Sequence, residues 1–441
     1  MLRLSHLSGC NSSDKNPPLR NLDDGDDSLS AFAQALGPDE LWVTLEGPEF
    51  HLLPAVHRGQ CAYDLPFFVT LPGPYRLNAL VLRGDYAALD EVTYENSSPP
   101  LNLDSISGDK LLLQLGSAAP AAQEAMRTAI LDASASALRL PACSSLGSAG
   151  EGRYVRTVAT TLSNTFSPIA PPFIAPYWPE GSRPFAYFVR LNEDYVYLPY
   201  ACRRPSFNAP RTAERCIQGH TIDLRGDSQT RTLFNHAMKR ICGVEEAAMK
   251  GIFDDQCVDE GTPGNFFCGK DGGRVCMTWD SMGESTPDDK FDVVATNFGQ
   301  WPASHFRIPV ANYQSLVKDF WKRLDGGDPP RSVQRMLWME TQPLCWTNAR
   351  DSKGDWRTHH RIMLYEEAAR QVLDNLLNVE IVGLWRQSLP LVPLCPDGNH
   401  MVTIDNALDA QLWSLLDAVC PGWAADVGGK YERDSTDSSR D

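Results

Sequence analysis

The sequence predicts an α/β protein, with a doubly wound and mostly parallel sheet, helices on both faces, and a small β-sandwich before it. Three observations predict this fold. The 441 residues are enough for two or three domains. The first third has short alternating apolar runs between turn-forming residues, which is typical of sandwich strands. The second half alternates strand-like and helix-like periods, and such a βα order requires crossover connections in a parallel sheet.

Composition divides the chain into five segments. Residues 1–38 are rich in Asp, Ser, Asn and Gly and are expected to form a flexible leader. The β-sandwich is expected over 39–132. An Ala/Ser/Gly-rich linker follows over 133–151. The α/β domain is expected over 152–430, and residues 431–441 form a polar tail.

The sandwich is predicted from three apolar runs with turn signals between them. The runs are Leu41–Leu45, Tyr63–Leu71 and Tyr75–Leu82. Gly47-Pro48 and Pro72-Gly73-Pro74 mark the turns.

In the α/β domain the expected elements follow one another in βα order. The strands are expected at His220–Arg225, Phe291–Thr296, Arg335–Met339 and Val379–Trp385. The helices are expected at Gln229–Ile241, Tyr313–Leu324, Arg361–Leu377 and Ala407–Val419, where apolar residues recur every three or four positions. Ligands of such sheets bind outside the carboxyl ends of the strands, so functional residues are expected there.

Charge and hydropathy exclude several classes of partner. Lys and Arg number 40 against 56 Asp and Glu, a net charge of −16. Nucleic acids and anionic membranes are recognised by clustered basic residues, so neither is expected as a partner. The hydrophobic content of 42% is too high for a disordered chain. No apolar run approaches the ~18 residues of a membrane span.

The cysteines predict disulfides and a secretory location. There are 12, widely spaced and without a CxxC pair, which disfavours a zinc ribbon; no metal is expected. Disulfides in the Golgi lumen or outside the cell fit better. Asn11 and Asn96 begin N-x-Ser sequons, which favours a glycoprotein. Residues 1–15 lack the apolar core of a signal peptide. Either a leader or anchor is missing from this sequence, or the protein is cytosolic.

Candidate catalytic residues lie where the predicted strands end. Ser228 follows Asp227 at a strand-to-helix turn, where a serine is displayed and its N–H can bind an oxyanion. The alternative is an Asp/Ser helix cap. Asn297 ends the next predicted strand. Asp397 and His400 share a loop after the last strand, where the carboxylate can orient the imidazole as a general base toward a serine.

Taken together, these motifs resemble a known family. Gly226-Asp227-Ser228, the N-x-G-x-W that starts at Asn297, and the D-x-x-H that starts at Asp397 are similar to the PC-esterase branch of the SGNH/GDSL hydrolase superfamily. That branch includes trichome-birefringence-like, Cas1-type and neurexophilin-and-PC-esterase-domain glycan O-acetyltransferases. The resemblance covers roughly Gly152 to Cys420. Asp-Gly-Asn-His-Met replaces the Asp-Cys-x-His-Trp of the plant enzymes, which puts a plant xylan substrate in doubt.

The resemblance implies an SGNH-like fold and a role for each motif residue. Ser228 would be the nucleophile, His400 the base and Asp397 its orienting carboxylate. Asn297 and the Ser228 N–H would form the oxyanion hole. Two further residues, Asp227 and Arg231, would have positioning roles. Gly283 is the candidate for an additional glycine donor. The P-G-x-Y-x-L stretch from Pro72 resembles a filamin/Ig-like repeat.

The expected function is a glycan or polysaccharide O-acetyltransferase that works through an acetyl-serine. The co-substrates would be acetyl-CoA or another acetyl ester and an oligo- or polysaccharide, with no cofactor. A secreted O-acetyl esterase with the same triad is the first alternative, and a non-catalytic glycan-binding protein is the second. Some tryptophans could stack on sugars, although each is expected in the core; they are Trp301, Trp346, Trp356, Trp385 and Trp413.

Overall fold

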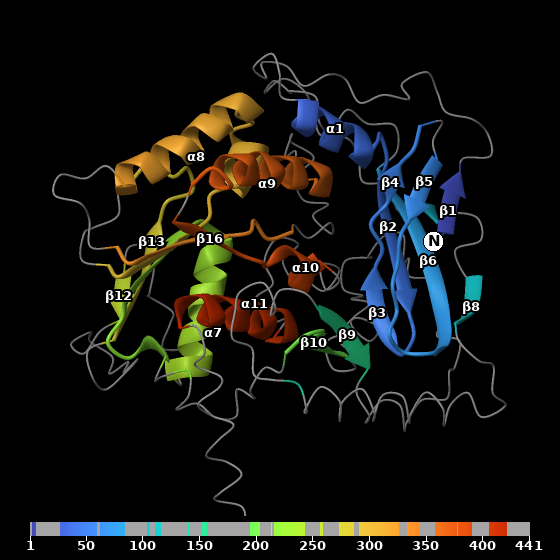
Figure 1. Cartoon of the computed structure of the whole chain (residues 1–441), viewed down its shortest axis with the longest axis horizontal. Helices are drawn as coiled ribbons and strands as arrows, with labels where there is room; N and C mark the ends of the chain where they lie inside the picture. Colours follow the sequence, from blue (N-terminus) through green and yellow to red (C-terminus); the bar gives the residue numbers. More distant parts are fainter. Residues whose placement is uncertain are drawn as a thin grey trace, which may run out of the picture.

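The computed structural model shows an α/β body beside two antiparallel sheets (Figure 1). It describes residues 2–5, 27–59, 62–83, 104–105, 111–115, 140, 152–156, 195–202, 213, 216–242, 256–258, 273–285, 291–325, 333–343, 358–376, 378–389 and 405–420. No helix within these ranges is long and apolar enough to span a bilayer.

The α/β body is built on a six-stranded sheet. Its strands in spatial order are β12 (Gln256–Val258), β13 (Arg274–Trp279), β11 (Thr221–Gly226), β14 (Val293–Thr296), β15 (Arg335–Met339) and β16 (Val379–Val382). The edge strand β12 runs antiparallel to β13, and the other five strands are parallel. The predicted mostly parallel sheet is therefore confirmed.

The order of the parallel strands identifies where a ligand site is expected. Numbered by their order in the chain, they lie 2-1-3-4-5 across the sheet. In such a doubly wound sheet the direction of winding reverses beside the first strand, and a crevice opens outside the strand ends at that point. Here the reversal lies between β11 and β14, the strands that precede Ser228 and Asn297.

Helices cover both faces of this sheet (Figure 1). On one face α7 (Ser228–Cys242) and α11 (Asp405–Val419) share an apolar core with the strands. On the other face lie α8 (Val310–Asp325) and α9 (His359–Leu373). Alternation along β14 divides the two cores: Val293 and Ala295 belong to the first, and Val294 to the second. A strand with apolar side chains on both faces fits only in a sheet that is covered on both sides.

The segment expected as a flexible leader contains ordered structure. Strand β1 (Leu2–Ser5) pairs with β5 (Ala62–Leu65). Helix α1 (Asp27–Leu36) packs against α9, and its Leu29, Ala33 and Leu36 enter the core of the α/β body. The helix was missed because the prediction used the average composition of residues 1–38. The acidic residues before the helix dominate that average, although apolar residues recur every three or four positions within the helix.

The remaining strands form two antiparallel sheets. The larger sheet runs β10 (Tyr195–Pro199), β9 (Gly152–Arg156), β3 (Glu49–Leu52), β2 (Glu40–Glu46), β6 (Gly73–Arg83) and β7 (Asp104–Ser105), with β8 (Leu111–Leu115) also on β6. The smaller sheet runs β1, β5 and β4 (Val56–His57). One apolar cluster takes side chains from both sheets.

Strands β9 and β10 differ from the expected domain boundary. Both follow the expected linker, yet β9 pairs with β3 and extends the N-terminal sheet. Strand β10 pairs with β9 in the same sheet, and its Tyr195 donates a hydrogen bond to the carbonyl of Gly47, 3.0 Å away, between β2 and β3. The sheet therefore combines segments from either side of the predicted boundary at residue 152.

Direct contacts join this sheet to the α/β body. Tyr154 on β9 donates a hydrogen bond to the carbonyl of Gln387. The buried carboxylate of Glu40 accepts a 2.9 Å bond from the N–H of His359, at the start of α9. The His359 ring also lies 5.9 Å from that of Trp42. Strand β9 thus contacts α10 (Trp385–Ser388), and β2 contacts the start of α9.

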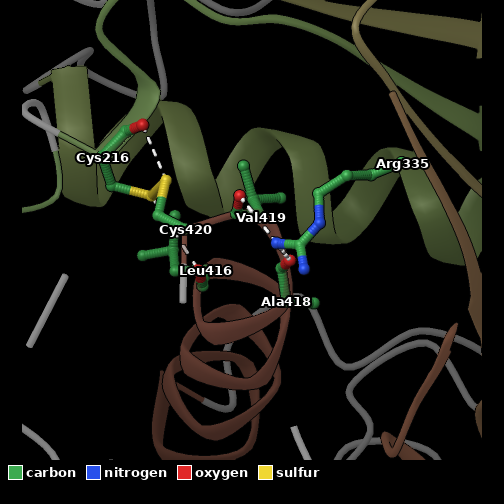
Figure 2. The surroundings of a disulfide bond; sticks show 6 residues. All are labelled: Cys216, Arg335, Leu416, Ala418, Val419 and Cys420. Carbon is green, nitrogen blue, oxygen red and sulfur yellow. Dashed lines mark hydrogen bonds between the residues drawn. A yellow bond between two sulfur atoms is a disulfide. The ribbon is translucent and has the colours of Figure 1, made fainter. Parts of the chain in front are cut away.

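A disulfide closes the α/β body (Figure 2). Cys216 precedes β11 and is bonded to Cys420, which directly follows α11; their Cα atoms are 5.6 Å apart. Arg335 donates to the carbonyls of Ala418 and Val419, which satisfies the last turn of α11. Cys202 and Cys276 are disulfide-bonded as well. The expectation of disulfides is thus confirmed at these positions.

Candidate functional site

Ser228 lies at the turn from β11 into α7. It is the first residue of the helix, so its N–H has no acceptor within the helix. Asp227 is fully buried, and its carboxylate accepts a 2.8 Å bond from the N–H of Gln229. The helix-cap alternative therefore describes Asp227 correctly. The cap also fixes the turn that leaves Ser228 half-buried at the carboxyl edge of the sheet.

Gly226 brings the serine turn against the end of β14. A Cβ atom at Gly226 would lie 2.4 Å from both the carbonyl oxygen of Asn297 and Oγ1 of Thr230. The Asn297 N–H donates to the carbonyl of Arg225, 2.9 Å away. Only a residue without a side chain allows this approach. The structure thus brings two predicted site residues, Ser228 and Asn297, to neighbouring strand ends.

The Asn297 side chain connects β14 to the end of β15. Its Nδ2 donates to the carbonyl of Met339 at 2.7 Å and to Oγ1 of Thr341 at 3.0 Å. Its Oδ1 accepts a 3.4 Å bond from the N–H of Gly299, the glycine of the N-x-G-x-W motif. A Cβ atom at Gly299 would lie 2.1 Å from Thr341 Oγ1. To stabilise an oxyanion, Nδ2 must exchange one of its two acceptors for the substrate.

A buried carboxylate, that of Glu366, holds Thr341 in place through hydrogen bonds. Glu366 on α9 accepts 2.9 Å bonds from both the N–H and Oγ1 of Thr341, and a 3.1 Å bond from Nε1 of Trp338. Burial raises the pKa of Glu366 to about 7, and the nearby charge of Glu340 adds to the increase. A hydrogen-bonded chain thus runs from Asn297 through Thr341 to a carboxyl group that titrates near neutral pH.

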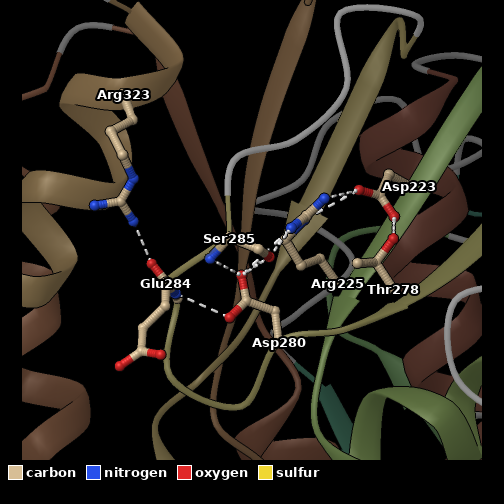
Figure 3. A network of polar contacts seen from close by, with 8 residues as sticks. Asp223, Arg225, Thr278, Asp280, Glu284, Ser285 and Arg323 are labelled. Carbon is tan, nitrogen blue, oxygen red and sulfur yellow. Dashed lines mark hydrogen bonds and ion pairs between the residues drawn. The ribbon is translucent and has the colours of Figure 1, made fainter.

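A buried ionic network joins β11 to β13 and is drawn in Figure 3. Arg225 donates to the carboxylate of Asp223 through Nε at 3.1 Å and NH2 at 2.9 Å, and to Asp280 through NH1 at 3.3 Å. Thr278 Oγ1 donates to the other oxygen of Asp223, 2.7 Å away. Burial raises the pKa of Asp223, while Arg225 and Thr278 oppose the increase. The network joins β11 to β13 beside the candidate site.

Asp280 also fixes the loop that follows β13. Its carboxylate accepts bonds from the N–H of Glu284 at 2.9 Å and from Oγ of Ser285 at 2.6 Å. Gly283 has φ of 65° and faces the ring of Phe298, 2.6 Å from where a Cβ would stand. Arg323 donates to the Gly283 carbonyl (Figure 3). The candidate additional donor therefore lies in a rigid loop, and its N–H is 3.5 Å from the Asp280 carbonyl.

Arg231 contacts an aromatic group at the same edge. Its guanidinium lies 5.5 Å from the ring centre of Trp279, the last residue of β13. Trp279 in turn packs edge-to-face against Trp301 at 5.9 Å. A positioning role for Arg231 agrees with this contact, which holds the first turn of α7 against the end of β13.

Other predicted residues fall elsewhere. Asp397 and His400 lie outside the described residues, so the triad stays a prediction. The same is true of the two sequon asparagines and of Trp346 and Trp356. Trp413 is buried in the core, as expected. Within the described ranges, no group of three or more His, Cys, Asp and Glu side chains is placed to hold a metal ion.

No protein-family model matches the chain, and no curated protein matches it.

Four residues of the candidate site were not predicted from the sequence: Arg225, Asp280, Thr341 and Glu366. Each lies at or near a strand end or on a helix that faces one, but no local motif marks them. Their pairings appear only when the strands are placed in order.

Proposed function

We propose that this protein is a glycan O-acetyltransferase that forms an acetyl ester on Ser228. The observation that carries the proposal is the position of Ser228. It is the first residue of α7, only partly buried, at the carboxyl edge where the winding of the sheet reverses. Acyl transfer needs a nucleophile beside an oxyanion donor, and Ser228 offers both its side-chain oxygen and a helix N–H without an acceptor inside the helix.

The proposed first step forms the acetyl-serine. Ser228 Oγ attacks the carbonyl carbon of an acetyl ester or thioester, and His400, oriented by Asp397, takes the hydroxyl proton. The Ser228 N–H and the Asn297 amide stabilise the oxyanion of the tetrahedral intermediate. When that intermediate collapses, the bond to the alcohol or thiol of the donor breaks, and the leaving group takes the proton from His400.

The second step transfers the acetyl group to a sugar. His400 takes a proton from a hydroxyl of the bound oligo- or polysaccharide, whose oxygen attacks the acetyl-serine carbon. The Ser228 ester bond then breaks, and the proton returns to Ser228 Oγ. If water is the acceptor instead, the same residues make an esterase. The acceptor that reaches the ester faster decides between the two activities.

The proposal includes an SGNH-like fold and an N-terminal β-sandwich, and two features of the structure support them. The 2-1-3-4-5 sheet order with a GDS turn after the first strand supports an SGNH-like fold. The apolar cluster shared by the two antiparallel sheets supports an N-terminal β-sandwich of filamin/Ig-like type. The Cys216–Cys420 disulfide favours an oxidising location, in the Golgi lumen or outside the cell.

Intact-protein mass spectrometry after mixing with 4-nitrophenyl acetate tests the proposal. The wild type should gain one acetyl group, about 42 Da, and Ser228→Ala should not. Ser315→Ala is the matched control, because Ser315 is an exposed serine on α8. Faster loss of the adduct with oligosaccharide present than in buffer alone identifies a transferase. Equal acetylation of wild type and Ser228→Ala would overturn the acyl-serine mechanism.

A further inference from the structure

Four aromatic side chains form a continuous group beside the serine turn. We call Trp279, Trp301, His305 and Phe306 the aromatic shelf. The Trp301 ring lies 5.9 Å from Trp279, 4.9 Å from His305 and 5.8 Å from Phe306. His305 and Phe306 are themselves 4.9 Å apart and edge-to-face. These separations are typical of aromatic rings that pack directly on one another.

The shelf begins at the strands that carry the candidate site. Trp279 ends β13 and is the register partner of Gly226, two residues before Ser228. Trp301 opens a π-helix, η1 (Trp301–His305), which starts two residues after Gly299. The shelf is therefore continuous with both strand ends at the winding reversal. A molecule seated on it would lie beside the reacting serine.

The shelf differs from the other aromatic groups of the α/β body in its exposure. Phe306 is 40% exposed, His305 is exposed, and both tryptophans are half-buried. Within the described ranges the exposed large hydrophobic side chains are Phe306, Tyr200 and Phe68. Core formation accounts for the buried Trp321 and Trp338, and for Trp279, which packs against the apolar core beside α7. It does not account for the exposed end of the shelf at His305 and Phe306. Exposed apolar groups beside a candidate site are typical of ligand surfaces.

Backbone geometry holds the shelf in this exposed position. The N–H of Phe306 donates to the carbonyl of Trp301 at 2.9 Å, a π-helical bond, and such rare single turns are frequent at functional sites. Arg307 follows with φ of 51°, a left-handed conformation that costs about 1 kcal/mol for a residue with a side chain. Strain of this kind persists where the surrounding structure imposes it. Here it turns the chain immediately after Phe306.

We propose that the aromatic shelf is the subsite for the acceptor sugar, where the C–H face of a neutral pyranose packs on the rings. The inference rests on the proposed function, because it makes the occupant the molecule that receives the acetyl group. The rings are not coplanar, since Trp279 and Trp301 stand at 88° and His305 and Phe306 at 83°. A pyranose would therefore pack its C–H face on a single ring, and its hydroxyls would remain free to reach the acetyl-serine. A polyanionic occupant is disfavoured by the net charge of −16.

Titration of tryptophan fluorescence with neutral oligosaccharides tests the shelf without requiring catalysis. The probes are hexamers of xylose, mannose, glucose and N-acetylglucosamine. We expect at least one to bind the wild type, and Phe306→Ala to weaken that binding by about tenfold. Phe306→Tyr should restore it. Phe68→Ala is the control, because Phe68 is 70% exposed but lies in the antiparallel part of the molecule.

The outcomes separate the shelf from the acyl-serine mechanism. Phe306→Ala should still be acetylated by 4-nitrophenyl acetate, since that small ester does not need the shelf. The proposal is overturned if none of the hexamers binds, if Phe306→Ala binds as tightly as the wild type, or if the variant loses affinity for acetyl-CoA and not for sugar. If the wild type binds sugar but is not acetylated at Ser228, the proposed function is overturned and the sugar-binding role of the shelf is not.

Discussion

At the scale of single residues, the candidate site depends on buried groups that no sequence motif predicted. Asn297 holds its orientation through Thr341, and Thr341 through Glu366. Each link is a hydrogen bond between buried atoms. Thr341 Oγ1, for example, donates its one hydrogen to Glu366 while it accepts from Asn297. A change at Glu366 is therefore felt at the strand end beside Ser228.

Glu366 predicts a pH dependence of stability. Its pKa rises from the ordinary 4.5 to about 7 in the folded state, mainly through burial. Between these two values the folded protein binds more protons than the unfolded chain, so the free energy of unfolding falls as pH rises through this window. Glu366→Gln removes the titrating group and should flatten that fall. Thermal unfolding measured from about pH 5 to about pH 8 checks this, with Glu367→Gln as the control. Parallel pH profiles for wild type and Glu366→Gln would contradict it.

At the scale of elements, the strands and helices were the most predictable part of the molecule. The buried run Phe291–Thr296 was predicted as a strand and contains β14, and Tyr313–Leu324 lies within α8. These patterns are local, since they follow from which faces of an element are buried. The pairing of β9 with β3 joins residues about 100 positions apart and leaves no local signal. The ionic network of Arg225 and Asp280 was missed for the same reason.

The candidate site was predictable to the same extent. Ser228 and Asn297 were found because they follow strand ends, and the structure brings those ends together. Neither hydrogen bond of Asn297 Nδ2 was predicted, because the acceptors, on Met339 and Thr341, belong to the end of another strand. Trp301 was singled out only as one of five tryptophans. Its place on the shelf depends on Trp279 and Phe306, which a helix and a strand bring to it.

The packing of β11 on the end of β14 predicts the effect of Gly226→Ala. The new methyl would stand 2.4 Å from the Asn297 carbonyl oxygen, so the two strand ends must separate. We expect a loss of about 1–3 kcal/mol in the free energy of unfolding, together with slower acetylation of Ser228. Gly219→Ala is the matched control, because its φ of 77° adds strain but a Cβ there meets no atom within 4 Å. It should reduce stability while acetylation stays at the wild-type rate. Denaturant unfolding and adduct formation measure the two effects, and unimpaired acetylation of Gly226→Ala would show that the strand ends tolerate separation.

At the scale of the whole molecule, α11 is the last described element of the chain and yet completes the core. It packs against α7, β15 and β16 in the α/β body and also against β10 of the antiparallel sheet. Its final turn is held by Arg335 and by the Cys216–Cys420 disulfide. The end of the described chain is thus fixed to a segment that precedes the first strand of the parallel sheet.

This closure predicts that the disulfide contributes to the stability of the whole α/β body. It spans 204 residues of sequence, so it removes a large closure entropy from the unfolded chain. Replacement of both cysteines by serine should lower the free energy of unfolding by roughly 2–5 kcal/mol, whereas acetylation of Ser228 should persist below the new melting temperature. The paired replacement leaves no unpaired thiol, and it separates this bond from those of Cys202 and Cys276, which a reductant would also break. An unchanged melting temperature would mean that packing of α11 alone closes the body, and Arg335→Ala would then be expected to have the larger effect.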